Sequence, residues 1–269
     1  MNRLGFGAMR ITGPGIWGEP KDEAEARRVL RRAVELGVNF IDTADSYGPE
    51  VSERLIGETL SPYPADLVVA TKAGLTRQGP NQWAPVGRPE YLRQQAEMSL
   101  RRLRVERIDL FQLHRIDPKV PVEESLGALV DLQRAGKIRH IGLSEVSPEE
   151  IERAQKTAKI MSVQNKYNLS DRAHEPTLAY CEKHKIAFIP WSPVAAGKLA
   201  GAGGALDQFA RRHEATVAQI SIAWLLHRSP VMLPIPGTST VKHLEENVAS
   251  RDLQLDANEW KQIESAAKS

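Results

Sequence analysis

The stretch Asn39–Gly48, with the sequence NFIDTADSYG, contains residue types that could transfer protons. It begins with apolar side chains such as Phe40 and then becomes polar, with Asp42 and Tyr47 ahead of a Gly-Pro pair. This change of character is typical of a buried strand that ends in a loop. A carboxylate and a phenol beyond a strand end are suited to acid–base chemistry, although a surface turn with a half-buried tyrosine has the same pattern.

Polar side chains also follow the other short apolar runs of the chain. In order along the sequence they are Lys72, His114, Ser144, Gln164 with Asn165, Trp191 with Ser192, and Thr238 with Ser239. Each has an ordinary explanation when taken alone, because a lysine after a strand is usually solvated and a lone histidine usually packs. Asp, Tyr, Lys and His at successive strand ends are harder to dismiss as coincidence.

The chemistry of these four side chains is coherent. A phenol with a pKa of about 10 donates poorly at neutral pH, but a neighbouring ammonium lowers that pKa. We expect Lys72 to have this effect on Tyr47, and Asp42 to hold the lysine in place and keep it charged. His114 could orient a carbonyl oxygen. Together the four predict the protonation of an oxyanion, which requires a separate hydride donor.

Short apolar runs alternate with amphipathic segments along the whole sequence. The runs expected to form strands cover residues 4–9, 38–42, 67–72, 108–114, 138–144, 161–164, 186–190 and 231–236. The segments expected to form helices cover 22–36, 51–60, 89–103, 122–135, a helix that begins at 147, 175–184, 216–228, 240–250 and 256–267. Eight such units in 269 residues predict an α/β fold, a (β/α)8 TIM barrel with a single domain over residues 1–269. A Rossmann fold is not favoured, because Gly5 and Gly7 form only the first half of a GxGxxG motif.

The composition limits the partners that the protein can have. The formal net charge of +2 gives no strong attraction to polyanions, and the short arginine runs fall within helical patterns. No apolar run of about 18 residues appears, and the opening MNRLGFGAMR does not resemble a secretory signal. Cys181, the single cysteine, excludes an intrachain disulfide and fits a reducing compartment as a packing residue. We therefore expect a cytoplasmic protein, a monomer by default, that binds neither nucleic acid nor membrane.

The ordered motifs resemble those of the aldo-keto reductase family along essentially the whole chain. They are NFIDTADSYG, VATK, LFQLH, HIGLSE, VQNKYN, IPWSP and IPGTSTVKHLEEN. The resemblance implies that Tyr47 is the general acid/base and that Asp42, Lys72 and His114 complete a catalytic tetrad. It also implies NADPH-dependent reduction of aldehydes or ketones, with reversible oxidation of alcohols.

The same resemblance implies which residues contact the cofactor. At the nicotinamide, Ser144 and Gln164 would bind the carboxamide near Asp42, and Trp191 would stack on the ring. Along the pyrophosphate would lie Ser192, Val194 and Gly197. Near the 2′-phosphate would lie Gly237, Thr238, Ser239 and His243, while Glu246 and Asn247 would hold the adenine. Thr238 and Ser239 are also suited to cap the next helix, whose N-terminus would favour an anion.

Three positions depart from the family pattern. Glu145 stands where asparagine is usual, and a carboxylate accepts but cannot donate a hydrogen bond, so it would have to turn away from the cofactor. Gly237 and His243 stand where lysine and arginine are frequent, and Lys242 could compensate. NADPH is therefore the expected cofactor, and NADH stays possible.

Two other classes of protein share some of these features. Lys72 at a barrel strand end could form a Schiff base, as in barrel aldolases, but that would leave Tyr47 and Trp191 without a role. Relatives of this fold also serve as NADPH-binding regulatory or sensor subunits with little turnover. Metal catalysis is not favoured, because no His, Asp or Glu spacing resembles a ligand set.

The sequence does not identify the substrate. We expect an open pocket whose walls include Ile11–Trp17, Gln82–Val86 and Ile116–Val120. Trp17 and Trp83 are the expected contacts for an aromatic or aliphatic aldehyde.

Overall fold

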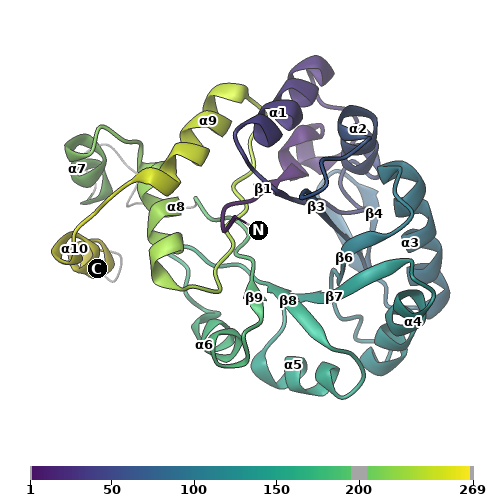
Figure 1. The fold of residues 1–269 in the computed structure, drawn as a ribbon. Helices are drawn as coiled ribbons and strands as arrows, with labels where there is room; N and C mark the ends of the chain where they lie inside the picture. Colours follow the sequence, from purple (N-terminus) through teal and green to yellow (C-terminus); the bar gives the residue numbers. More distant parts are fainter. Residues whose placement is uncertain (1, 195–204, 267–269) are drawn as a thin grey trace.

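The chain forms a curled parallel sheet surrounded by helices. In the computed structural model, which describes residues 2–194 and 205–266, seven parallel strands pair in the order β1-β2-β3-β6-β7-β8-β9 (Figure 1). They are β1 (Phe6–Gly7), β2 (Phe40–Asp42), β3 (Val68–Ala73), β6 (Ile108–Leu113), β7 (Ile138–Ser144), β8 (Ile160–Gln164) and β9 (Ala187–Phe188). The curled sheet and its ring of helices confirm the predicted (β/α)8 barrel.

Most of the helices follow the segments expected from the sequence. They are α1 (Glu23–Glu35), α2 (Val51–Leu60), α3 (Pro89–Leu103), α4 (Val122–Arg134), α5 (Pro148–Gln155), α6 (Glu175–His184), α8 (Val217–Arg228), α9 (Val241–Ala249) and α10 (Ala257–Ala266), with short 3-10 turns η1 (Ala8–Ile11), η2 (Pro14–Ile16) and η4 (Ser250–Asp252). Local chemistry sets several of the starts. Ser147 and Thr216 each form a complete capping box, at the beginning of α5 and of α8.

Two elements were not expected from the sequence. One is an antiparallel hairpin, β4 (Leu75–Gly79) and β5 (Gln82–Pro85), which follows β3 directly and lies beside the barrel mouth. The other is α7 (Ala205–Arg212), which contacts α8 and α10 outside the ring of helices (Figure 1). The buried residues Leu206, Phe209 and Ala210 have helical spacing, so the apolar periodicity could have revealed α7.

The barrel closes through a segment that is not a regular strand. The sequence predicted an eighth strand over 231–236, and this prediction is only partly right. The bonds that close the barrel run from Phe188 N to Val231 O (2.9 Å), from Leu233 N to Phe188 O (2.8 Å) and from Gly5 N to Pro234 O (2.9 Å). Pro234 and Pro236 have no N–H to donate, so a full ladder cannot form between β9 and β1. Residues 231–236 therefore form an extended closing segment with few hydrogen bonds.

Inside the barrel an apolar layer lies below a polar layer. The apolar layer consists of Phe40, Ala70, Leu110, Ile189, Leu233 and Ile235. Two residues further along β2, β3 and β6 are Asp42, Lys72 and Gln112, which are all buried. Because side chains in a strand alternate between faces, these three face the same interior as the apolar layer. The polar layer lies at the carboxyl ends of the strands, which is the edge where barrel enzymes carry their active sites.

A glycine in β7 makes room for this polar layer. Gly142 lies opposite Gln112 on one side and Ser162 on the other. A Cβ at this position would lie 2.3 Å from Ser162 Oγ and 2.9 Å from Gln112 Cγ. A larger residue at 142 would therefore displace Gln112, which contacts Asp42 in the candidate site.

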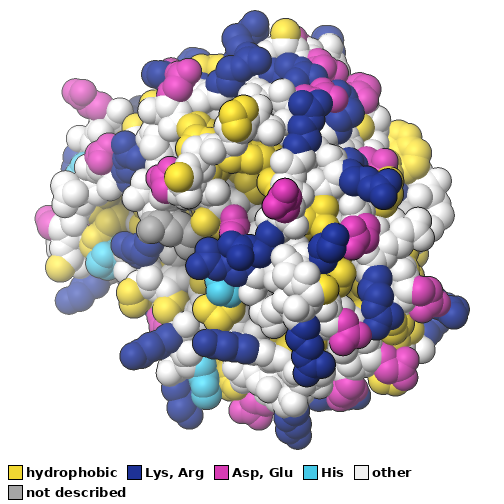
Figure 2. All heavy atoms as spheres, turned by 45° about the vertical axis from the view of Figure 1, so that its right-hand side comes forward, with side chains coloured by type: hydrophobic (Ala, Val, Ile, Leu, Met, Phe, Trp, Pro, Cys, Tyr) yellow, Lys and Arg dark blue, Asp and Glu magenta, His cyan; other side chains and the backbone are white. Residues whose placement is uncertain are grey.

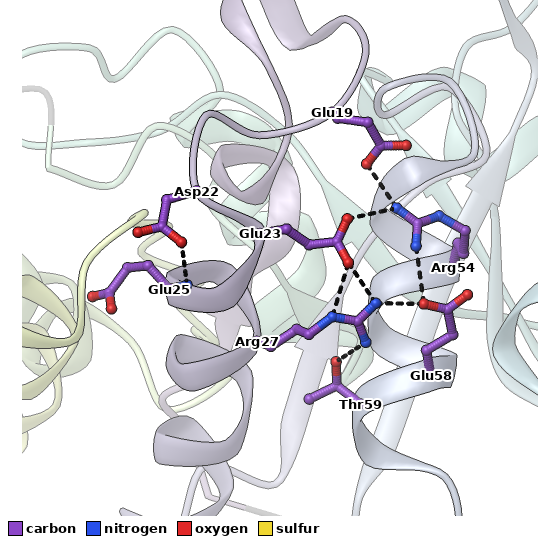
Figure 3. Close-up of polar contacts among 8 residues, drawn as sticks. All are labelled: Glu19, Asp22, Glu23, Glu25, Arg27, Arg54, Glu58 and Thr59. Atoms are coloured by element: carbon purple, nitrogen blue, oxygen red, sulfur yellow. Dashed lines mark hydrogen bonds and ion pairs between the residues drawn. The ribbon is translucent and has the colours of Figure 1, made fainter.

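An ion-pair network joins the first two helices of the ring (Figure 3). Arg27 of α1 contacts Glu23 at 2.6 Å and Glu58 at 2.5 Å, and Arg54 of α2 contacts Glu58 at 2.9 Å and Glu19 at 2.6 Å. Exposed pairs of this kind contribute up to about 1 kcal/mol each. Burial of the apolar faces is therefore the main force that fixes α1 and α2 against the barrel.

The surface is mixed in charge. On the face drawn in Figure 2, basic and acidic side chains lie intermixed. None of the helices within the described residues is long and apolar enough to span a membrane.

Candidate active site

Lys72 lies at the centre of a buried polar cluster. Its Nζ donates to Asp42 Oδ1 at 2.5 Å, to the carbonyl oxygen of Thr43 at 2.8 Å and to Tyr47 Oη at 3.4 Å. Since an ammonium has three N–H donors, each donor has an acceptor. β2 and the loop after it supply Asp42 and Tyr47, and β3 supplies Lys72, so neighbouring parallel strands bring the three side chains together.

Burial controls the protonation of this cluster. It raises the pKa of Tyr47, and the Lys72 ammonium offsets only part of that rise. Burial alone would lower the pKa of Lys72, but the Asp42 carboxylate and Tyr47 outweigh it and raise the pKa of the lysine. Lys72 therefore stays charged and lowers the pKa of Tyr47, both as expected, but burial has the larger effect and the net shift of the Tyr47 pKa is upward. The phenol is held in its protonated form at neutral pH.

His114, which follows β6, lies beside Tyr47. The two ring centroids are 5.9 Å apart at an interplanar angle of 81°, and His114 Nδ1 lies 3.3 Å from Ser46 Oγ. Burial lowers the pKa of His114 well below its ordinary value, and the nearby Lys72 and Arg115 cations lower it further. The imidazole is therefore neutral at neutral pH and retains one N–H that can donate to a carbonyl oxygen.

Both oxygens of the Asp42 carboxylate are occupied. Lys72 binds Oδ1, while Gln112 Nε2 donates to Oδ2 at 3.0 Å and Gln164 Nε2 donates to the same oxygen at 2.9 Å. The sequence reasoning did not single out Gln112. Its position opposite Lys72 in the pairing of β3 with β6 was the available signal, because it places an amide in the same interior layer.

Arg77 in the hairpin ties together three loops at the barrel mouth. Its donors bind five backbone carbonyl oxygens, those of Ile16 (2.6 Å), Ser46 (2.7 Å), Gly15 (3.0 Å), Gln82 (3.0 Å) and Gly79 (3.2 Å). The guanidinium also lies on the ring of Trp83, 3.6 Å from its centroid. Because Ser46 immediately precedes Tyr47, Arg77 fixes the backbone next to the phenol. The sequence reasoning missed this residue, since bonds to backbone carbonyls leave no trace in residue types.

A cavity of about 640 Å³ opens over this cluster. Its lining includes the predicted residues Asp42, Tyr47, His114, Ser144, Gln164, Trp191, Ser192, Val194 and Gly237, together with Gly7, Met9, Arg10, Ile16, Leu75, Trp83, Pro85, Arg115, Pro193 and Ile235. The structure thus places a protonated phenol and a neutral imidazole in one wall, close to Trp191 and polar groups from β7 and β8. Two hydrogen-bond donors that face one cavity can stabilise a developing oxyanion. Within the described residues, no three His, Cys, Asp or Glu side chains gather in a way that could hold a metal ion.

The other predicted cofactor residues that the structure describes do not line this cavity. Thr238 and Ser239 precede α9, and His243, Glu246 and Asn247 lie within it, while Gly197 lies outside the described residues. The residue that caps α9 is Thr240, whose Oγ1 accepts from His243 N at 3.4 Å, and Thr238 Oγ1 accepts from Thr240 N at 3.2 Å. The N–H of Val241 is bound by Glu25 Oε1 at 2.9 Å. One donor at this helix N-terminus is therefore already taken by a carboxylate.

Glu145 turns away from the cavity and holds Trp191. Its Oε1 accepts from Trp191 Nε1 at 2.6 Å and from the backbone N–H of Lys166 at 2.7 Å. Its backbone adopts the left-handed region with φ of 56°, which directs the side chain differently from an extended residue. The carboxylate that replaces the usual asparagine thus orients the indole ring rather than pointing into the cavity.

The expected pocket walls are partly right. Ile16 and Trp83 line the cavity, whereas Trp17 packs against Arg77. The guanidinium carbon of Arg77 lies 5.6 Å from the centroid of the Trp17 ring. Ile116–Val120 was predicted wrongly, because this segment lines a separate depression of about 420 Å³ beside α5. The Asp117 carboxylate binds the N–H of Gly87 at 2.9 Å and holds the segment there.

Comparisons with known proteins identify the family of the chain. The model of the aldo/keto reductase family matches residues 3–268. An uncharacterized oxidoreductase of Schizosaccharomyces pombe is 52% identical over 269 residues, covering 100% of this chain and 88% of the relative. The pyridoxine 4-dehydrogenase of Escherichia coli is 41% identical over 261 residues, covering 95% of this chain and 91% of the relative. The solved structure of a glycerol dehydrogenase from Gluconobacter oxydans matches with a TM-score of 0.88 at 29% identity, covering 99% of this chain and 91% of that one.

The chain belongs to the aldo/keto reductase family, whose members are oxidoreductases that use NADP(H). The resemblance inferred from the sequence motifs is confirmed.

Proposed function

We propose that this chain is an NADPH-dependent reductase of aldehydes and ketones in which Tyr47 donates the proton. One observation carries the proposal: the protonated phenol of Tyr47, beside the buried Lys72–Asp42 pair, lies in the same cavity wall as the neutral imidazole of His114. As the carbonyl oxygen gains negative charge, the two donors stabilise it. Tyr47 then gives its proton to that oxygen, and Lys72 stabilises the phenolate that remains.

The cavity suits a nicotinamide cofactor. About 640 Å³ lies in the usual range for small-molecule sites. NADPH, when bound, supplies the hydride. We assign Asp42, Ser144, Gln164, Trp191, Ser192 and Val194 to the nicotinamide and pyrophosphate, and Gly237, Thr238, Ser239, His243, Glu246 and Asn247 to the adenosine end. The support is the position of the first group in the cavity wall and of the second group at α9.

The relatives suggest the first substrate to test. A protein 41% identical to this chain is named as a pyridoxine 4-dehydrogenase, and its reaction interconverts an alcohol and an aldehyde. Pyridoxal and other aromatic aldehydes therefore lead the set of candidate substrates. Trp83 and Ile16 supply apolar surface in the cavity for such a ring.

The geometry does not favour the Schiff-base alternative. A lysine must be neutral to attack a carbonyl carbon, yet all three N–H groups of Lys72 are bound and its pKa is raised. The regulatory-subunit alternative differs from the proposal only in turnover. Turnover is therefore the quantity to measure.

The test is NADPH oxidation with reactive aromatic aldehydes, comparing the wild type with Tyr47→Phe. We expect kcat to fall roughly 10²- to 10⁴-fold, because the proton donor is lost, while the Kd for NADPH stays within about twofold. Tyr180→Phe is the matched control, since the Tyr180 hydroxyl bonds to exposed Gln155 on the outside of the barrel. Full activity in Tyr47→Phe would contradict the assigned role. Tight NADPH binding without turnover of any carbonyl would favour a regulatory subunit, and no binding at all would contradict both.

A further inference from the structure

The cavity that holds the proposed site carries unbalanced positive charge. Within the part of the chain that the structure describes, its lining contains a single carboxylate, Asp42, and that carboxylate is paired with Lys72. It also contains two guanidinium groups, those of Arg10 at the exposed rim and Arg115 in the half-buried wall. Among the residues that the structure describes, neither arginine forms an ion pair. A polar cavity with this balance of charge favours an anionic ligand.

The guanidinium of Arg115 is bonded through one nitrogen and leaves the other two nitrogens without an acceptor among the described residues. Its Nη1 donates to the carbonyl oxygen of His114 at 2.6 Å and to Ser144 Oγ at 3.0 Å. Over residues 2–194 and 205–266, its Nε and Nη2 have no hydrogen-bond acceptor. Nε and Nη2 lie along one edge of the guanidinium. In proteins generally, an arginine can bind a carboxylate along one edge through two parallel hydrogen bonds.

Glu145, the acidic group that acts on the pKa of Arg115, does not serve as its hydrogen-bond partner. Glu145 is close enough to act on the pKa of Arg115, but burial has the larger effect and lowers that pKa. The Glu145 carboxylate is committed to Trp191 Nε1 and to the N–H of Lys166. The wall of the cavity thus contains a partly desolvated cation whose acidic neighbour is engaged elsewhere, and an anionic ligand would stabilise this cation.

Resting on the proposed function, we propose that Arg115 recognises an anionic group of the carbonyl substrate. The preferred substrates are then aldehydes or ketones that carry a carboxylate, with the carbonyl oxygen at Tyr47 and His114 and the carboxylate at the free edge of Arg115. The anchoring of Nη1 by two acceptors keeps that edge in a fixed orientation, so little ordering is needed when the substrate binds.

The experiment compares two aldehydes of nearly the same shape at saturating NADPH, 4-carboxybenzaldehyde and its neutral methyl ester. We expect the wild type to have the higher kcat/KM for the acid. In Arg115→Gln, kcat/KM for the acid should fall roughly 10- to 100-fold, as expected for loss of charge-assisted hydrogen bonds, while that for the ester stays within about threefold. Arg115→Lys keeps the charge without the paired donors and should retain part of the preference. Arg134→Gln, which changes an arginine that is 79% exposed on α4, is the matched control.

Several results would overturn the inference. One is a wild type that does not prefer the acid. Another is an equal loss for acid and ester in Arg115→Gln, which would indicate a purely structural role. A third is a weaker Kd for NADPH in Arg115→Gln, which would assign the free edge to the cofactor. If Arg115→Gln does not fold, the test uses Arg115→Lys alone. An unchanged preference for the acid in Arg115→Lys would then contradict the inference. Failure of the proposed function gives a different result, because then neither aldehyde is reduced by the wild type.

Discussion

On one side of the cavity, the ends of β2, β3 and β6 bury Asp42, Lys72 and His114. Asp42 and Lys72 pair with each other and with neighbouring groups, and His114 Nδ1 lies within hydrogen-bond distance of Ser46 Oγ. We call this the acid–base side. On the other side, Trp191, Ser192 and Val194 follow β9 and lie next to the closing segment 231–236, where few backbone hydrogen bonds form. We call this the cofactor side. Proton transfer requires fixed distances and low water content, whereas a site that admits and releases a large ligand requires surfaces that are less tightly bound.

The difference predicts that substitutions on the acid–base side change stability and chemistry, while those on the cofactor side change binding. Three experiments test this contrast, in order of decreasing effect.

The largest effect is expected at Asp45, two residues before Tyr47. Its Oδ2 accepts from Tyr91 at 3.1 Å, its buried Oδ1 has no partner, and burial raises its pKa from 3.8 to about 8. The folded protein therefore binds one more proton than the unfolded chain between these two pH values, so stability should fall as pH rises through this window. Over the whole window the fall should be on the order of 6 kcal/mol, because each pKa unit corresponds to about 1.4 kcal/mol, and about 4 kcal/mol of it should fall above pH 5. Asp45→Asn should remove most of it.

Urea unfolding at pH 5 and pH 9 measures this effect. Asp131→Asn, which removes a carboxylate from the surface of α4, should leave the pH dependence of the wild type intact. An Asp45→Asn protein with the same pH dependence as the wild type would show that this buried carboxyl group has no such linkage.

An intermediate effect is expected at Arg77. Arg77→Lys keeps the charge but loses most of the five bonds to backbone carbonyls, so the loops that carry Ser46 and Trp83 should shift slightly. A displacement of about 1 Å from the reacting geometry costs up to roughly 10²-fold, so kcat/KM for an aldehyde should fall about 10- to 100-fold. The Kd for NADPH should stay within about twofold, because none of the contacts of Arg77 involves Trp191, Ser192 or Val194.

The control is Arg88→Lys, at an arginine that is 70% exposed. Equal losses in kcat/KM and in NADPH affinity for Arg77→Lys would contradict the separation of the two sides.

The smallest effect is expected at Glu145. Glu145→Ala removes the acceptor that orients Trp191, so NADPH should bind about 5- to 10-fold more weakly, while kcat at saturating NADPH should change less than about twofold. Glu145→Gln keeps an acceptor oxygen and should restore most of the affinity. Direct titration of NADPH gives the Kd values. A large fall in kcat with unchanged affinity would assign Trp191 to the chemistry rather than to binding.

The acid–base side was easier to predict from the sequence than the cofactor side. Asp42, Lys72 and His114 end apolar runs, and the carboxyl ends of parallel strands meet at one edge, so their convergence followed from the strand pattern alone. The sign of the pKa shift at Tyr47 did not follow, because it depends on burial, which residue types do not reveal. The proposed roles of these side chains still depend on the kinetic tests.

Where the sequence reasoning failed, the interactions involve the backbone or its local conformation. Arg77 binds only carbonyl oxygens, and any residue supplies a carbonyl oxygen. Glu145 lies in the left-handed region, so its direction could not be inferred from the neighbouring HIGLSE strand. The expected strand over 231–236 was read from apolar residues, although its prolines limit the hydrogen bonds it can form.

The hydrogen bonds to both oxygens of Asp42 have a consequence for the reprotonation of Tyr47. With Lys72 on one oxygen and two glutamine amides on the other, this carboxylate accepts three hydrogen bonds and donates none, so it has no proton of its own to pass on. If Tyr47 gives up its proton as proposed, Asp42 cannot replace it, and the phenolate must be recharged from the solvent side of the cavity. Turnover would then depend on when water regains access to Tyr47, so product departure and reprotonation would be coupled events.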